Sequence, residues 1–128
     1  MNLNQITVPS LDVEKAIQFY QQLGLNLIVK TLPKYARFEC PEGDATFSIH
    51  QVDYLSNGPG VVIYFECENL DQQVSELLEK GVVFEQLPKD QSWLWKEARL
   101  RDPDNHQIVL FNAGSNRKNP PWRLDVLN

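Results

Sequence analysis

The sequence predicts an α+β fold in which two tandem βαβββ modules form a cupped, eight-stranded mixed sheet arrangement. The first observation behind this prediction is a duplication. The stretch QITVPSLDVEKAIQFYQQLGL, starting at Gln5, aligns without a gap with VIYFECENLDQQVSELLEKGV, starting at Val62, at an offset of 57 residues. The second observation is that each stretch joins a strand pattern to a helix pattern that ends at a glycine, Gly24 or Gly81. The repeat divides one domain into module one (1–57), module two (58–114) and a C-terminal tail (115–128).

Module one is expected to contain a strand, a helix and three further strands. Polar and apolar residues alternate over residues 3–8, as they do in a strand with one buried face. Asp12 is a suitable N-cap, and the apolar residues that follow it recur at helical spacing. Turn residues then separate strands expected at 25–31, 35–40 and 45–51.

Module two repeats this order after a linker that runs from Val52 to Gly60. Asn69 and Gln72 have the spacing of a helical capping box, and an apolar stripe follows them. Further strands are expected at 82–87, 95–101 and 106–112. The tail is too rich in proline and asparagine for regular structure, and Trp122 leads us to expect that it packs onto another surface.

The composition excludes several classes of partner. Of the 128 residues, 42% are hydrophobic and 23% charged, and 12 Lys and Arg against 17 Asp and Glu give a formal net charge of −5. An acidic chain without a basic cluster has no electrostatic surface for nucleic acid or anionic lipid. No apolar run approaches the roughly 20 residues that span a bilayer. The N-terminus has no signal-peptide pattern, so we expect a cytoplasmic protein.

Common catalytic motifs are missing from the sequence. Cys40 and Cys67 do not form a C-x-x-C pair, and Cys67 lies between Glu66 and Glu68, which disfavour a reactive thiolate. His106 follows a turn-forming DPDN segment and is interpreted as a turn residue. There is no G-x-S-x-G motif and no glycine-rich phosphate loop, so a nucleotide cofactor is not expected.

Three segments in order resemble one family. The two repeated stretches and the closing LRDPDNHQIVLF are similar to the vicinal oxygen chelate superfamily, which contains glyoxalase I, extradiol dioxygenases and bleomycin resistance proteins. The resemblance covers roughly residues 3–113. It implies paired βαβββ modules, assembly as a homodimer, and a metal or ligand site in the cupped sheet.

The resemblance also locates the family's metal-ligand positions. Here they carry Gln5 on the first strand, Ser48 near the end of the fourth, Val62 at the start of the fifth and Val109 in the last. Divalent metal ions are held mainly by imidazole, carboxylate and thiolate, and valine has no donor atom. We therefore expect no metal cofactor at these positions.

A displaced metal site is the alternative. Side chains two residues apart on a strand share a face, so His50 lies on the face of Ser48 and Glu66 on the face of Val62. Gln5, His50 and Glu66 are then candidate ligands of a divalent ion. The competing interpretation is that His50 is a surface histidine and Glu66 a solvated carboxylate.

Aromatic residues indicate a binding cavity instead. Trp93 and Trp95 share a face with Glu97 and Arg99 if their strand starts early, and Tyr64 and Phe111 point to the side of Val62 and Val109. Aromatic walls with a few polar groups are typical of small-molecule sites. The predicted ligand-binding residues are Gln5, Thr7, Ser48, His50, Val62, Tyr64, Glu66, Trp93, Trp95, Val109 and Phe111. They could instead plug the cavity or form a dimer core.

Three functions follow from these patterns. The preferred hypothesis is metal-independent binding of a small molecule, similar to bleomycin resistance proteins, in a cavity of a homodimer. The alternative is a metal-dependent lyase, isomerase or dioxygenase similar to glyoxalase I, which uses the displaced site. A third is an interaction module whose cavity is filled by its own side chains. Arg37 and Glu39 alternate on one strand, and the sequence alone assigns them no role.

Overall fold

The computed structural model describes residues 1–124 and confirms the α+β class and the βαβββ order. The elements are β1 (Gln5–Ser10), α1 (Val13–Leu23), β2 (Asn26–Thr31), β3 (Tyr35–Glu39), β4 (Thr46–Gln51), β5 (Val62–Glu66), α2 (Leu70–Glu79), β6 (Gln86–Asp90), β7 (Lys96–Arg101), β8 (Gln107–Asn112) and a 3-10 helix, η1 (Gly114–Arg117). They form two compact units, which we describe separately. No helix among the described residues has the length and apolar character needed to cross a membrane.

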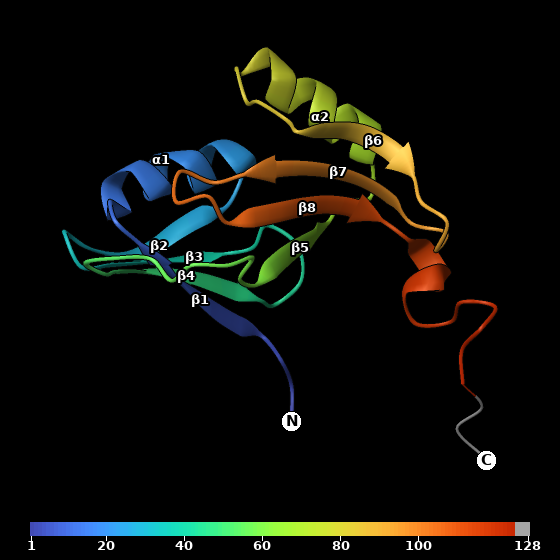
Figure 1. Cartoon of the computed structure of the whole chain (residues 1–128), viewed down its shortest axis with the longest axis horizontal. Helices are drawn as coiled ribbons and strands as arrows, with labels where there is room; N and C mark the ends of the chain where they lie inside the picture. The colour runs from blue at the N-terminus through green and yellow to red at the C-terminus, as the bar shows by residue number, and fades with distance from the viewer. Residues whose placement is uncertain (125–128) are drawn as a thin grey trace. The chain divides into compact units, whose positions relative to one another are not determined.

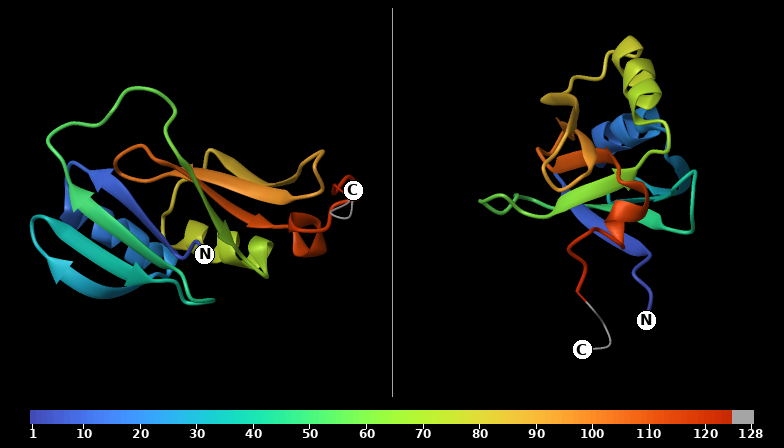
Figure 2. Two further views of the ribbon diagram at one scale, coloured as in Figure 1. Left: turned by 90° about the horizontal axis from the view of Figure 1, so that it is seen from below. Right: turned by 90° about the vertical axis from the view of Figure 1, so that its right-hand side faces the viewer.

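Unit 1 comprises Met1–Val61 and Asp102–His106. Its four strands have the order β1-β4-β3-β2, with β1 parallel to β4 and the other neighbours antiparallel. Helix α1 packs on one face of this sheet (Figure 1). Residues 52–61 form an arch without regular structure, drawn in green in the left view of Figure 2.

The covered face of unit 1 holds an aromatic core. Tyr20 of α1 lies between Phe38 of β3 and Phe47 of β4, with ring centroids 6.0 and 4.6 Å away. All three side chains are at most 2% exposed. Asp12 caps the helix as predicted, because its carboxylate accepts a hydrogen bond from the Lys15 amide at 3.2 Å.

Unit 2 comprises Val62–Arg101 and the chain from Gln107 onward. It repeats the topology of unit 1, with the strand order β5-β8-β7-β6 and a parallel β5–β8 pair. Helix α2 packs on one face, where Leu70, Val74 and Leu77 are buried. Figure 2 shows this helix beside the yellow and orange strands.

One segment crosses the boundary that the repeat suggested. The turn 102–106, which the sequence repeat placed in module two, belongs to unit 1. The Tyr20 hydroxyl donates to the Asp102 carboxylate at 2.5 Å, and a ring nitrogen of His106 lies 2.7 Å from the Pro9 carbonyl oxygen. The Asp104 carboxylate accepts from the Leu11 amide at 2.8 Å. The β7–β8 connection thereby completes the core of unit 1.

Several predicted boundaries were wrong by a few residues. The first strand was expected at 3–8 and spans 5–10, because Pro9 is tolerated in a strand that pairs only with β4. The strand expected at 82–87 is β6 at 86–90. Val82 follows α2 and caps its C-terminal end, since its amide donates to the Leu77 carbonyl after Gly81, which has φ +88°.

One predicted side-chain contact was also wrong. The Asn69 side chain forms no capping hydrogen bond. The side-chain amide of Gln72 donates to Glu76, one helical turn later. Trp122 of the tail is 57% exposed, and the packing expected for it stays a prediction. The last four tail residues, 125–128, lie outside the described residues.

The Tyr20–Asp102 bond predicts a large effect of a small substitution. Tyr20→Phe removes one hydroxyl that is fully buried and bonded to a carboxylate. We expect the free energy of unfolding to fall by about 1.5–3 kcal/mol, the range for a hydrogen bond to a charged group. Urea unfolding measures it. Tyr54→Phe is the control, because Tyr54 is 80% exposed, and a loss as small as in this control would contradict the assignment.

Asp102 predicts a pH dependence of stability. Burial raises the pKa of its carboxyl above the ordinary 3.8, against the hydrogen bonds from Tyr20 and the turn amides. The folded state therefore binds this proton more tightly than the unfolded state. Its contribution to stability is greatest below about pH 3.8 and is lost as pH rises through the raised pKa. Asp102→Asn should remove this part of the slope in urea unfolding measured across that range.

Candidate functional site

Each sheet has one face covered by its helix and one face without a helix. In unit 1 the register places Gln5, Thr7, Ser48 and His50 on the uncovered face, where Tyr35, Arg37, Glu39 and Thr46 join them. In unit 2 the uncovered face carries Val62, Tyr64, Glu66, Trp95, Glu97, Arg99, Val109 and Phe111. The first face is mainly polar, whereas the second carries three aromatic side chains, two valines and three charged residues.

A chain of hydrogen bonds crosses the uncovered face of unit 1. The Gln5 side-chain amide donates to the Ser48 hydroxyl at 2.7 Å. The Ser48 and Tyr35 hydroxyl oxygens are 2.7 Å apart, and Arg37 Nε donates to the Tyr35 oxygen at 2.9 Å. The Arg37 guanidinium also lies over the Tyr35 ring, 5.5 Å from its centroid. Ser48 is fully buried at the centre of this chain.

The four family metal positions do not fit a divalent ion. The oxygen of the Gln5 amide, its one possible ligand atom, accepts a hydrogen bond from Thr46, and its nitrogen bonds to Ser48. Val62 and Val109 offer no donor atoms. Within residues 1–124, no group of three or more His, Cys, Asp or Glu side chains is placed to hold a metal.

The displaced set finds no support within either unit. Gln5 is opposite Thr46 and His50 is opposite Pro9, so Gln5 and His50 are four residues apart along the strands. Their backbone positions are thus about 13 Å apart, so the two side chains would have to extend toward each other along the strands to share one ion. Glu66 belongs to unit 2, where its carboxylate is 4.0 Å from Arg117.

Three aromatic rings form a cluster on the uncovered face of unit 2. Trp95 stacks on Phe111, with centroids 4.6 Å apart and planes inclined by 17°. Tyr64 meets both rings edge-on, at 5.9 and 5.7 Å. Phe111 and Val109 are buried, while Tyr64 is 47% exposed. The cluster thus presents a partly exposed tyrosine ring that packs against Trp95 and Phe111.

A buried carboxylate lies on the same face. Glu97 is fully buried, and its two oxygens accept from the Trp93 indole at 2.8 Å and from Arg99 at 3.0 Å. Trp93 reaches Glu97 from the turn before β7, in which Leu94 has a φ of +67°, and not from an early strand as predicted. Arg99 Nε is buried without a hydrogen-bond partner among the described residues.

Sequence reasoning did not assign a role to Tyr35, Arg37 or Thr46. These residues alternate along two strands that the sequence predicts, and paired strands place alternate residues on one face. In the structure Arg37 is directly opposite Ser48. The register needed to use that alternation comes only from the folded sheet. Cys40 and Cys67 form no disulfide bond, and burial raises the pKa of the Cys40 thiol.

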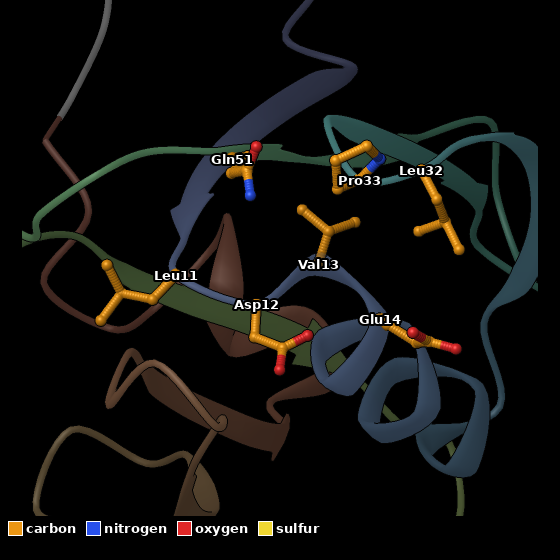
Figure 3. Close-up of a pocket in the computed structure, with 7 residues that line it drawn as sticks. All are labelled: Leu11, Asp12, Val13, Glu14, Leu32, Pro33 and Gln51. Carbon is orange, nitrogen blue, oxygen red and sulfur yellow. The ribbon is translucent and has the colours of Figure 1, made fainter.

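A small hollow lies at the N-terminal end of α1 (Figure 3). Its lining residues are Leu11, Asp12, Val13, Glu14, Leu32, Pro33 and Gln51. The Asp12 carboxylate is occupied by capping the helix, and none of the predicted site residues lines the hollow. We assign it no function.

Comparisons with known proteins agree with this fold. Residues 2–110 match the family model of the Glyoxalase/Bleomycin resistance protein/Dioxygenase superfamily. The chain belongs to this superfamily.

The relatives of this superfamily member span nearly its full length. The uncharacterized protein YraH of Bacillus subtilis (strain 168) is 27% identical over 127 residues, which cover 87% of this chain and 98% of YraH. A glyoxalase/bleomycin resistance protein/dioxygenase from Nocardioides has a TM-score of 0.76 at 20% identity, covering 98% of this chain and 90% of that one. Lactoylglutathione lyase from Agrobacterium tumefaciens has a TM-score of 0.72 at 15% identity, covering 87% and 92%. These structures share the fold.

The ion pair on the aromatic face predicts unequal effects of two similar substitutions. Arg99→Met leaves one oxygen of the fully buried Glu97 carboxylate without its donor and should lower the free energy of unfolding by about 1–3 kcal/mol. Arg101 lies on the same strand as Arg99 but pairs with the exposed Glu85. Arg101→Met should therefore lower the free energy of unfolding by only about 0–1 kcal/mol. Urea unfolding compares them, and equal losses would contradict the role given to Arg99.

Proposed function

We propose that this superfamily member binds a small planar molecule on the uncovered face of unit 2 and does so without a metal ion. The observation that carries the proposal is the cluster of Tyr64, Trp95 and Phe111 on a sheet face that has no helix. Aromatic rings prefer stacked and edge-to-face partners, and Tyr64 still has an exposed surface to offer one. The chemistry favours an apolar, aromatic ligand.

The polar groups on this face also support an apolar ligand. Both oxygens of Glu97 are already paired, so this carboxylate is not a free anion that would attract a cation. The exposed part of Trp93, 41% of its surface, adds a second aromatic edge near this carboxylate. A ligand here would be held by contact area and ring geometry.

The donor chemistry supports independence from metal. The family metal positions of unit 2 are Val62 and Val109, and those of unit 1 are an amide and a hydroxyl that bond to each other. We further propose that the protein works as a homodimer, as the superfamily resemblance suggests. Size-exclusion chromatography with light scattering tests this, and a monomer at micromolar concentration would contradict it.

Removing the exposed ring should weaken ligand binding without unfolding the protein. For Tyr64→Ala we expect the Kd of quinoline or indole, measured by fluorescence titration, to rise about 3- to 10-fold, the equivalent of one aromatic pair. Trp122→Ala is the matched control, because Trp122 is an exposed aromatic residue of the tail outside the cluster. If neither compound binds the unaltered chain, or if both variants bind equally, the proposed site is wrong.

A metal titration separates this function from a metal-dependent lyase or dioxygenase. The purified chain, incubated with Ni²⁺, Mn²⁺ or Fe²⁺ and then desalted, should retain far less than one equivalent of metal by elemental analysis. Stoichiometric binding that Gln5→Ala or His50→Ala abolishes would overturn metal independence. Such a result would favour the displaced site.

A further inference from the structure

The hydrogen bonds on the uncovered face of unit 1 have a defined direction. The Gln5 nitrogen contacts the carbonyl oxygen of Ile6 at 3.2 Å, and a carbonyl oxygen can only accept. The amide nitrogen therefore faces Ile6, Thr7 and Ser48, and the amide oxygen faces Thr46. Gln5 is thus a donor to the Ser48 oxygen.

Ser48 must then donate its own proton onward. The side chain is fully buried, and a buried hydroxyl proton without an acceptor destabilises the folded state. The Ser48 oxygen already accepts from Gln5, and the Tyr35 oxygen is its other hydrogen-bond partner. Ser48 therefore donates to Tyr35.

Two donors converge on the phenolic oxygen of Tyr35. Ser48 donates from one side and Arg37 Nε from the other, at 2.7 and 2.9 Å. Both acceptor positions of this oxygen are filled, and its own proton has no acceptor among the described residues. The hydroxyl proton of this partly exposed side chain remains available on the uncovered face.

Arg37 brings a positive charge to the same place. Its Nε is used by Tyr35, but its two terminal nitrogens have no hydrogen bond or ion pair with any residue in 1–124. An arginine edge and a neighbouring hydroxyl are matched donors for the two oxygens of a carboxylate.

We propose that Tyr35 and Arg37 form a carboxylate-binding site in unit 1, in which the Tyr35 hydroxyl and the terminal nitrogens of Arg37 donate to the ligand. The side chains of this site belong to unit 1 and those of the proposed aromatic site belong to unit 2, so the two proposals are tested independently. Gln5 and Ser48 act as positioning residues, because they direct the Tyr35 proton toward the ligand without touching it.

The electrostatics of Tyr35 agree with this role. Partial burial acts to raise the pKa of the phenol, but the hydrogen bonds from Ser48 and Arg37 and the Arg37 charge outweigh it, so the pKa lies below 10.0. Besides Arg37, the titratable side chains on this face near Tyr35 are His50, directly opposite it on β4, and Glu39, on its own strand β3. On β2 the residue opposite Tyr35 is the uncharged Thr31. A bound carboxylate needs the protonated phenol.

The test uses cyclohexanecarboxylate, a carboxylate without an aromatic ring, and its neutral analogue cyclohexanecarboxamide. Both are titrated into the full chain and followed by ¹H–¹⁵N NMR. We expect saturable shifts confined to β3 and β4 with the carboxylate, and at least about 10-fold weaker binding of the carboxamide. Shifts located elsewhere, equal binding of the two compounds, or tighter binding of inorganic phosphate would overturn the proposal.

Variants separate ligand contact from support of the fold. Arg37→Gln should weaken carboxylate binding about 10-fold or more, and Tyr35→Phe about 3- to 10-fold. Lys30→Gln removes an equal charge from β2 opposite Ala36, on the other face, and should change the Kd less than about 2-fold. An unchanged Kd in Arg37→Gln, or equal effects of Arg37→Gln and Lys30→Gln, would overturn the site.

A pH signature distinguishes a ligand donor from a structural residue. In the unaltered chain the affinity should fall as pH rises through the lowered pKa of Tyr35, and in Tyr35→Phe this fall should be absent. By linkage, saturating carboxylate should raise the Tyr35 pKa, measured by ¹³C NMR of the labelled phenol carbon and assigned with Tyr35→Phe. A pKa that the ligand leaves unchanged would contradict direct donation.

Discussion

Each four-stranded sheet packs against a single helix, and this limit on burial shapes everything else in the protein. Along each central strand the apolar side chains that face the helix alternate with side chains that face away from it. In unit 1, for example, Phe47 and Ile49 join the core under α1, while Ser48 between them faces the other way. The uncovered faces are free to carry chemistry because the helix-covered faces already supply the core of each unit.

The two uncovered faces have diverged although the two units share one topology. Gln5 and Val62 occupy the same place at the start of their sheets, and Ser48 and Val109 the same place on the strands beside them. In unit 1 these places belong to a network of polar groups that satisfy one another. In unit 2 they adjoin stacked rings. A duplicated framework thus presents two surfaces of different chemistry.

The sequence was sufficient to predict the fold because the fold depends on local patterns. Alternation, helical spacing and the glycines after each helix are properties of short segments, and the same patterns occur in both copies of the repeat. The sequence could not predict the Tyr35–Arg37 contact or the pairing of both Glu97 oxygens, for a physical reason. They depend on the register between strands and on a turn in which Leu94 has an unusual backbone conformation, and neither leaves a pattern along the chain. The same holds for the turn 102–106, whose partners are more than 80 residues away.

That turn has a consequence for how the protein is made. Residues 102–106 are synthesised after most of unit 2, yet they supply the acceptor for the buried Tyr20 hydroxyl of α1. While the chain emerges from the ribosome, unit 1 has its strands and helix long before it has this acceptor. The first unit therefore cannot reach its final packed state by the time its own last strand is complete. Although the two units are alike in topology, the N-terminal one is finished only when the C-terminal one is nearly complete.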